Sequence, residues 1–186
     1  MNSFFFRLLA LCALTLLLCK AVVAQEILLK NLVLDNVAGD IQLRFGVEVE
    51  ALDQVKDLLQ DGVTITMTSE SRLIRTRSLI WDKTLEQSGL EFELKEDPLS
   101  KTYVLTDTKN EKVMKNKDLG ALIQSNWSSL TMSLGNWNDL PQGVKYAMNL
   151  QVVLKRANVP VWLKTALFFW SWDVVDQKHY RMDFLY

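Results

Sequence analysis

Cysteine is scarce in this sequence. Cys12 and Cys19 are the two cysteines among 186 residues, and both precede residue 25. From residue 25 onward the chain can form no disulfide and can supply no catalytic thiolate or zinc-thiolate ligand. Each cysteine follows a leucine. Because lipid attachment would need a small residue at that position, we do not expect a lipid anchor.

Residues that commonly carry catalysis are also few. His179 is the one histidine, and its position opposite the apolar face of a predicted strand places it towards solvent. A catalytic triad also needs a nucleophile and an orienting acid. The seven glycines are scattered singly, which excludes a phosphate-binding glycine loop. We therefore expect no enzyme activity, no catalytic residue, no cofactor and no metal site. A carboxylate-based hydrolase stays open as an alternative, because two acids can meet in a fold.

Excess positive charge is absent as well. Of the 21 lysines and arginines, Arg7 and Lys20 precede residue 25, which leaves 19 basic residues against 22 acidic ones. This balance gives no general attraction for nucleic acid. We therefore expect no nucleic-acid partner.

The first 24 residues have the features of a secretory signal peptide. Arg7 supplies the positive charge, residues 8–18 are almost entirely apolar, and small residues precede Gln25. The apolar run is shorter than the ~20 residues of a membrane-spanning helix. We predict cleavage after residue 24, one β-rich domain over 25–186, and a periplasmic location. Lys20 leaves open a retained leader that holds the domain at the inner membrane.

Alternation of apolar and polar residues dominates the rest of the chain. A period of two predicts strands with one buried face. Clear alternation covers 41–49, 63–68, 90–95, 144–154 and 180–186, and weaker strands are expected over 27–34, 73–81 and 102–106. About eight strands joined by short turns predict a mainly β fold, an antiparallel β-sandwich or a partly closed barrel.

Three segments have helical spacing instead. Residues 52–60 and 118–130 each have an apolar stripe, and Asp118 is suited to cap the second helix. Pro160 suits the first turn of a third helix that reaches about residue 170. We expect two or three short helices to cover the β-structure.

Three arginines form the first candidate surface. Arg72, Arg75 and Arg77 lie close together in the sequence. They could bind an anion, a lipid head group or an acidic partner. The simpler interpretation, which we favour, is an outer sheet face whose arginines form cross-strand ion pairs with Glu91 and Glu93.

An aromatic segment is the second candidate surface. Residues 161–172 are apolar on almost every side of the expected helix. Such a helix is buried or lies against a membrane or a partner. Core packing is the favoured interpretation. If the segment is exposed, its docking residues would be Trp162, Phe168, Phe169 and Trp170.

The end of the chain offers a different interpretation. Tyr180, Met182, Phe184 and Tyr186 alternate with polar residues or leucine, and this pattern resembles the last strand of outer-membrane barrels. A small outer-membrane β-barrel is therefore a second alternative. The expected helices and the short strands argue against it.

Several short motifs follow one another along the chain. They are Gly46 with Glu48, Asp61-Gly62-Val63, Arg75 with Arg77, Leu99-Ser100 with Tyr103, Asp118-Leu119, Gly143 with Tyr146, Val159-Pro160 and Ser171-Trp172. Their order and spacing resemble a bacterial family, the domain of unknown function 4390, found mainly in proteobacteria. The resemblance implies an exported β-rich protein and transfers no catalytic residue. Genes of this family often neighbour a membrane sensor histidine kinase, which makes such a kinase a candidate partner.

These observations predict an exported, non-catalytic binding or accessory protein of the bacterial cell envelope. The expected partner is a membrane protein such as a sensor kinase, or the membrane surface itself. The aromatic segment and the arginine strand are the surfaces that would make the contact.

Overall fold

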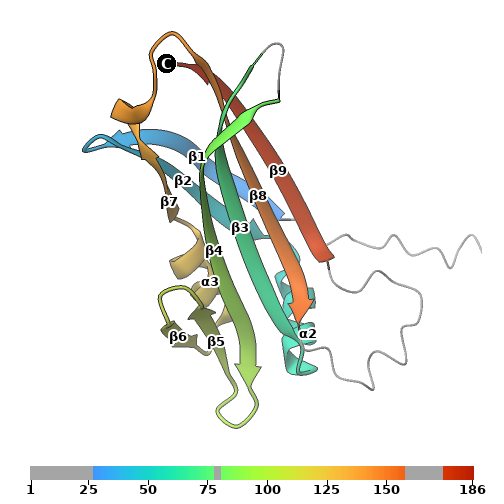
Figure 1. Ribbon diagram of the computed structural model, residues 1–186. Helices are drawn as coiled ribbons and strands as arrows, with labels where there is room; N and C mark the ends of the chain where they lie inside the picture. The colour runs from blue at the N-terminus through green and yellow to red at the C-terminus, as the bar shows by residue number, and fades with distance from the viewer. Residues whose placement is uncertain (1–26, 78–80, 158–173) are drawn as a thin grey trace, which may run out of the picture.

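The computed structural model describes residues 27–77, 81–157 and 174–186 (Figure 1). Its strands form two antiparallel sheets, which confirms the predicted mainly β sandwich. The small sheet has the order β1 (Ile27–Val37), β2 (Asp40–Val49), β7 (Leu130–Asn136). The large sheet has the order β6 (Lys112–Asn116), β5 (Thr102–Asp107), β4 (Lys83–Asp97), β3 (Thr64–Arg75), β8 (Lys145–Ala157), β9 (Val174–Leu185). The signal peptide, the third expected helix and the aromatic segment lie outside the described residues.

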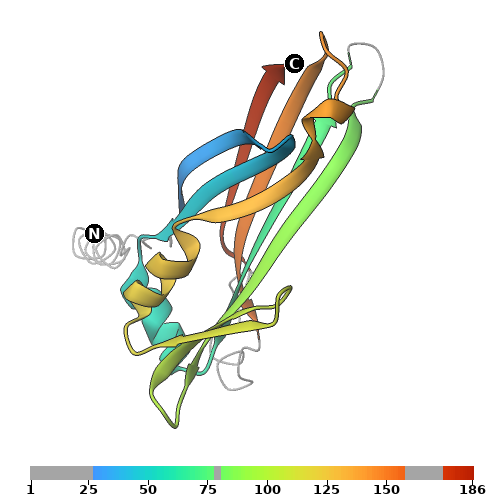
Figure 2. The same cartoon turned by 90° about the vertical axis from the view of Figure 1, so that its left-hand side faces the viewer.

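Two α-helices complete the layer of the small sheet. The helices α2 (Leu52–Gln60) and α3 (Leu119–Trp127) stand beside the small sheet and cover the part of the large sheet that it leaves open (Figure 2). Helix α2 contacts β3 and β4, and α3 contacts β5 and β6. A short 3₁₀ helix, η1 (Trp137–Asp139), follows β7. Among the described helices, none combines the length and the apolar character that crossing a membrane requires.

Strand β3 corrects the prediction of two separate strands over 63–68 and 73–81. It runs without interruption from Thr64 to Arg75. The inward positions between its apolar ends are Ser69 and Ser71, and both are buried. The Ser71 hydroxyl donates to the Asn149 carbonyl at 3.1 Å. Two buried serines interrupt the apolar alternation while the backbone continues as a strand.

The core lies between the two layers and is mostly apolar. Trp127 of α3 is buried and meets Phe92 edge to face at 6.3 Å between ring centroids. At the end where β9 finishes, Trp137 packs against Phe184 and Tyr186, with centroid distances of 5.9 and 5.0 Å. Aromatic contacts of this kind stabilise a core beyond the area that they bury.

Helix α3 begins as the sequence predicts and ends earlier. Asp118 is the N-cap, and its side chain accepts a hydrogen bond from the Ala121 amide at 3.0 Å. The helix ends at Trp127 rather than at residue 130, because Leu130 already belongs to β7. The chain between them passes close to β2, where a side-chain carbon at Gly46 would lie 2.6 Å from the Ser128 carbonyl oxygen.

Candidate binding surface

The outward face of the large sheet carries ordered rows of polar side chains. Strand register places Arg72, Asn149 and Arg181 side by side on β3, β8 and β9. The next row contains Glu70, Gln151 and His179. These six residues line a hollow of about 420 Å³. His179 is exposed, as its position in the sequence predicts.

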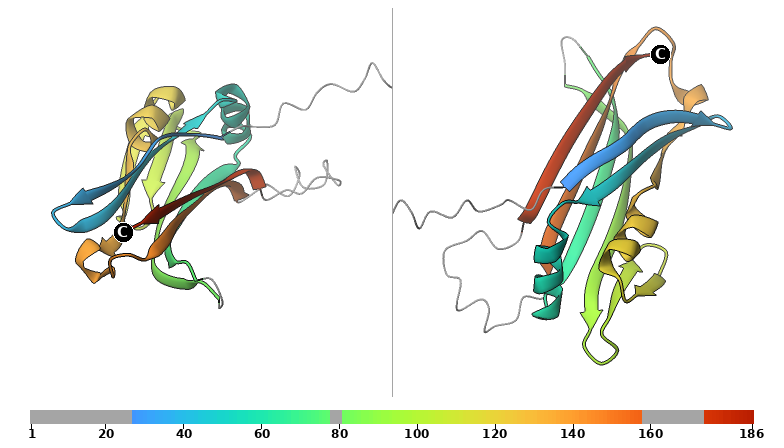
Figure 3. Two further views of the ribbon diagram at one scale, coloured as in Figure 1. Left: turned by 90° about the horizontal axis from the view of Figure 1, so that it is seen from above. Right: turned by 180° about the vertical axis from the view of Figure 1, so that it is seen from behind.

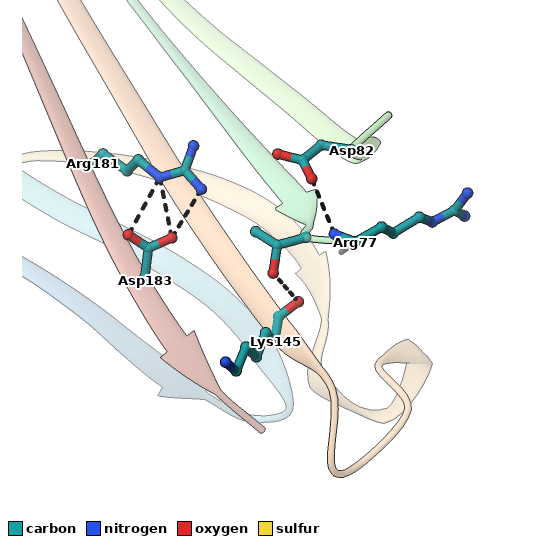
Figure 4. Close-up of polar contacts among 6 residues, drawn as sticks. Arg77, Asp82, Lys145, Arg181 and Asp183 are labelled. Atoms are coloured by element: carbon teal, nitrogen blue, oxygen red, sulfur yellow. Dashed lines mark hydrogen bonds and ion pairs between the residues drawn. The ribbon is translucent and has the colours of Figure 1, made fainter. Parts of the chain in front are cut away.

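Two arginines of this face form hydrogen-bonded ion pairs with acidic residues of their own strands. The Arg72 guanidinium donates to Glu70 at 2.6 Å. The Arg181 guanidinium donates to Asp183 at 2.9 and 3.1 Å, and these hydrogen bonds raise the pKa of Arg181 (Figure 4).

The prediction that the arginines pair with Glu91 and Glu93 is therefore wrong. Strand β4 does pair with β3, but Glu91 and Glu93 lie opposite Thr68 and Thr66. Arg72 lies opposite Gln87. The sequence located the neighbouring strand, whereas the register between the strands sets the partner of each side chain.

The three arginines of the predicted cluster lie in different environments. Arg72 lies on the outward face, while Arg75 lies opposite Tyr146, whose ring is buried. Arg77 follows the end of β3, and its backbone amide donates to Asp82 at 3.0 Å. Figure 4 shows its side chain extending away from the strands. The structure thus spreads the arginines along one end of the large sheet.

Two lysines join Arg75 and Arg77 at this end. Lys83 lies directly opposite Arg75 on β4. The Thr76 hydroxyl donates to the Lys145 carbonyl at 3.0 Å and ties the end of β3 to the start of β8 (Figure 4). Within the described residues, none of these four side chains forms an ion pair. We call Arg75, Arg77, Lys83 and Lys145 the basic end of the large sheet.

A large exposed aromatic side chain adjoins the basic end. Trp81 is 93% exposed and lies two residues before Lys83. Tryptophan combines a large apolar ring with one polar group, and it is enriched where proteins dock. A hollow of about 470 Å³ lies at the same end, between Lys145, Arg181 and the last residues of β9.

A further hollow, of about 370 Å³, lies on the other side of the molecule between β2 and α3. Gly46, Leu52 and Ile123 are among its lining residues. Lys30 and Glu48, which form an ion pair, also line it. Among the described residues, no group of three or more histidine, cysteine or acidic side chains could hold a metal ion.

Comparison with family models identifies the chain. The model of the domain of unknown function DUF4390 matches residues 24–183. The chain belongs to the DUF4390 family. The match begins before β1 and ends within β9, and it includes both α-helices and the basic end of this DUF4390 protein. The comparisons with curated proteins and with solved structures found no match.

Sequence reasoning missed Trp81, Lys83 and Lys145 as part of the DUF4390 surface. The expected strand over 73–81 includes Trp81, because it runs past the actual end of β3. Lys83 is close in sequence to the arginines, and a hairpin between them would have suggested contact. Lys145 joins the surface through the pairing of β3 with β8, which no local pattern indicates.

Proposed function

We propose that this protein is an exported, non-catalytic binding protein of the bacterial cell envelope that docks a partner protein through its basic end. The pairing of Arg75 with Lys83 carries this proposal. Like charges directly opposite each other destabilise a sheet. An acidic group of a partner between the two side chains would remove a repulsion that the fold leaves in place.

Trp81 supports a protein partner. Tryptophan, tyrosine and arginine dominate the binding energy of protein interfaces when they enter pockets of the partner. Trp81 is almost fully exposed and is followed by Asp82 and Lys83. A large exposed ring beside four basic side chains that form no ion pair among the described residues fits an apolar pocket with an acidic rim.

The predicted leader and the family supply the rest of the proposal. A signal peptide over residues 1–24 would deliver the domain to the periplasm. The gene neighbourhood of the family favours a membrane sensor histidine kinase as the partner. We therefore propose that the basic end contacts an acidic surface of such a kinase on the periplasmic side.

Crosslinking in cells tests the proposed surface. The full chain is crosslinked, purified and searched for membrane proteins by mass spectrometry. We expect Trp81→Ala and Lys83→Glu each to lower the affinity for the partner, and with it recovery at limiting protein, by roughly thirtyfold, since interface anchors of this kind are worth about 2 kcal/mol. Lys95→Glu, on the same strand at its other end, makes the same charge change and should leave recovery unchanged.

Lys83→Glu also separates binding from folding. The new carboxylate would lie opposite Arg75, so the free energy of unfolding should rise by about 0.2–1 kcal/mol while binding falls. Chemical denaturation of the purified variants measures this change. Full recovery of the partner with both variants would overturn the proposal that the basic end binds it. If vesicles of anionic phospholipid retain the chain and crosslinking recovers no protein, the basic end binds the membrane surface and not a protein partner.

A further inference from the structure

Strand β9 forms an open edge of the large sheet. It pairs with β8 on one side, and no described strand pairs with its other side. The first residue of β1 approaches the start of β9, where the Ile27 amide donates to Asp176 at 2.6 Å. From there β1 diverges from β9 (Figure 3). The described residues leave the later part of β9 uncovered along its edge.

The direction of the free backbone groups follows from the last pair of the ladder. Tyr186 and Val144 exchange both backbone hydrogen bonds, at 3.1 and 3.2 Å. In an antiparallel ladder, residues alternate between such pairs and pairs without hydrogen bonds. The register from Lys178 to Leu185 has no shift. The N–H and C=O groups of His179, Arg181, Asp183 and Leu185 therefore point away from β8.

The other described edges carry the features that block strand addition. Strand β1 has a register shift after Lys30, and Asn31 within it has a φ of 52°. Strand β6 has 5 residues, two of them lysines. Strand β7 has 7 residues and a shift in its pairing with β2. Bulges, lysines and short length protect sheet edges. Strand β9 has 12 residues, one lysine and no register shift from Asp176 to Leu185.

A second copy of β9 fits this edge best in one register, the one that brings opposite charges and aromatic rings face to face. Two-fold pairing centred on Arg181 or Asp183 would place like charges opposite each other, which destabilises a sheet. Pairing centred on Met182 places Arg181 opposite Asp183 of the second copy, twice. It also places Tyr180, which is 42% exposed, opposite Phe184 of the second copy, and aromatic cross-strand pairs stabilise sheets.

We propose that two copies of this chain associate through β9, antiparallel and with Met182 on the two-fold axis. The outward-pointing groups of Arg181 and Asp183 would then exchange hydrogen bonds between the copies, and the two large sheets would become one. Met182 would face its own copy in a pair without hydrogen bonds, where Cα atoms lie about 4.5 Å apart. This interface is independent of the proposed basic-end surface.

Single cysteines test the register, because residues 25–186 contain none. A disulfide needs Cα atoms within about 7 Å. Met182→Cys should give a disulfide-linked dimer of the full chain under mild oxidation. Arg181→Cys or Asp183→Cys alone should not, since each would lie about 8 Å from its own copy. Mixing those two variants should restore the crosslink. The unsubstituted chain reports any contribution of Cys12 and Cys19.

Charge reversal tests the same interface without cysteine. Arg181→Asp and Asp183→Arg should each weaken the dimer by roughly tenfold in sedimentation equilibrium, and the double reversal should restore it. A folded Met182→Cys chain that stays monomeric would overturn the proposal. Equal crosslinking of all three single-cysteine variants would overturn the register, because it would show unspecific contact.

Discussion

Gly46 shows how one residue sets the distance between two elements. A side-chain carbon at this position of β2 would lie 2.6 Å from the carbonyl oxygen of Ser128. Its φ lies outside the left-handed region, so the position requires space rather than unusual backbone freedom. The absence of a side chain allows the segment after α3 to pass over β2 and continue into β7.

Gly46→Ala should therefore lower the free energy of unfolding. A methyl group forced against backbone costs about 1–3 kcal/mol, because α3 or β2 must move. Urea denaturation measures the loss. Gly89→Ala is the matched control, since its new carbon would meet the Ser69 carbonyl oxygen at 3.4 Å, an ordinary contact. Equal destabilisation by the two variants would contradict the steric explanation.

At the scale of elements, the start of helix α3 is fixed by a capping side chain. Helix α3 carries the buried Trp127 and covers β5 and β6, so the position of its first turn affects the packing of the layer. Asp118 fixes that turn through its hydrogen bond to the Ala121 amide. Capping side chains of this type satisfy amides that have no partner within the helix.

Asp118→Ala should lower the free energy of unfolding by about 1 kcal/mol. Asp118→Asn keeps an oxygen that accepts the Ala121 amide, so it should retain most of the stability. Amide hydrogen exchange in the first turn of α3 would locate the effect, with faster exchange in the alanine variant alone. Similar loss with asparagine would indicate that charge, rather than the hydrogen bond, stabilises the turn.

Local sequence patterns predicted most of the helices and strands, but they predicted little about which strands pair with each other. Alternation located β2, β8 and β9, and Asp118 located the start of α3. Strand β7 also alternates, with Leu130, Met132 and Leu134 buried, but the apolar stripe of the preceding helix masked its start. Strand β6, with 5 residues, is too short for its pattern to be recognised.

The candidate surface depended on the pairing of strands more than on local pattern. Arg75 meets Lys83 through the register of β3 with β4, and Lys145 reaches β3 from the far half of the chain. The sequence named two of the four residues of the basic end because they were adjacent in the chain. The other two required the pairing of the strands.

At the scale of the whole molecule, packing must replace crosslinks. With the leader removed, no cysteine would remain, so reductant should leave the melting temperature unchanged. A disulfide contributes about 2–4 kcal/mol, and its reduction would lower that temperature by several degrees. Differential scanning calorimetry with and without reductant checks this. A clear drop would mean that Cys12 and Cys19 remain attached and oxidised, which mass spectrometry of the intact chain would reveal.

The two proposed surfaces also combine at this scale. Lys145 of the basic end lies opposite Leu185, close to Met182 along β9. In an antiparallel dimer with Met182 on its axis, the two basic ends would therefore lie on opposite sides of that axis, one on each side of the joined β9 strands. Such an arrangement would suit a partner that is itself two-fold symmetric.

The pairing of β3 with β8 at the centre of the large sheet has a consequence for synthesis and transport. Ser71 and Asn149, which join these strands, are 78 residues apart in the chain. Contacts between such distant residues form slowly, because a long loop must close first. If the leader directs export as its sequence predicts, the sheet cannot close until nearly the whole chain has emerged. Slow formation of this pairing would keep the polypeptide unfolded and competent for export during its passage across the membrane. The domain would then fold after translocation.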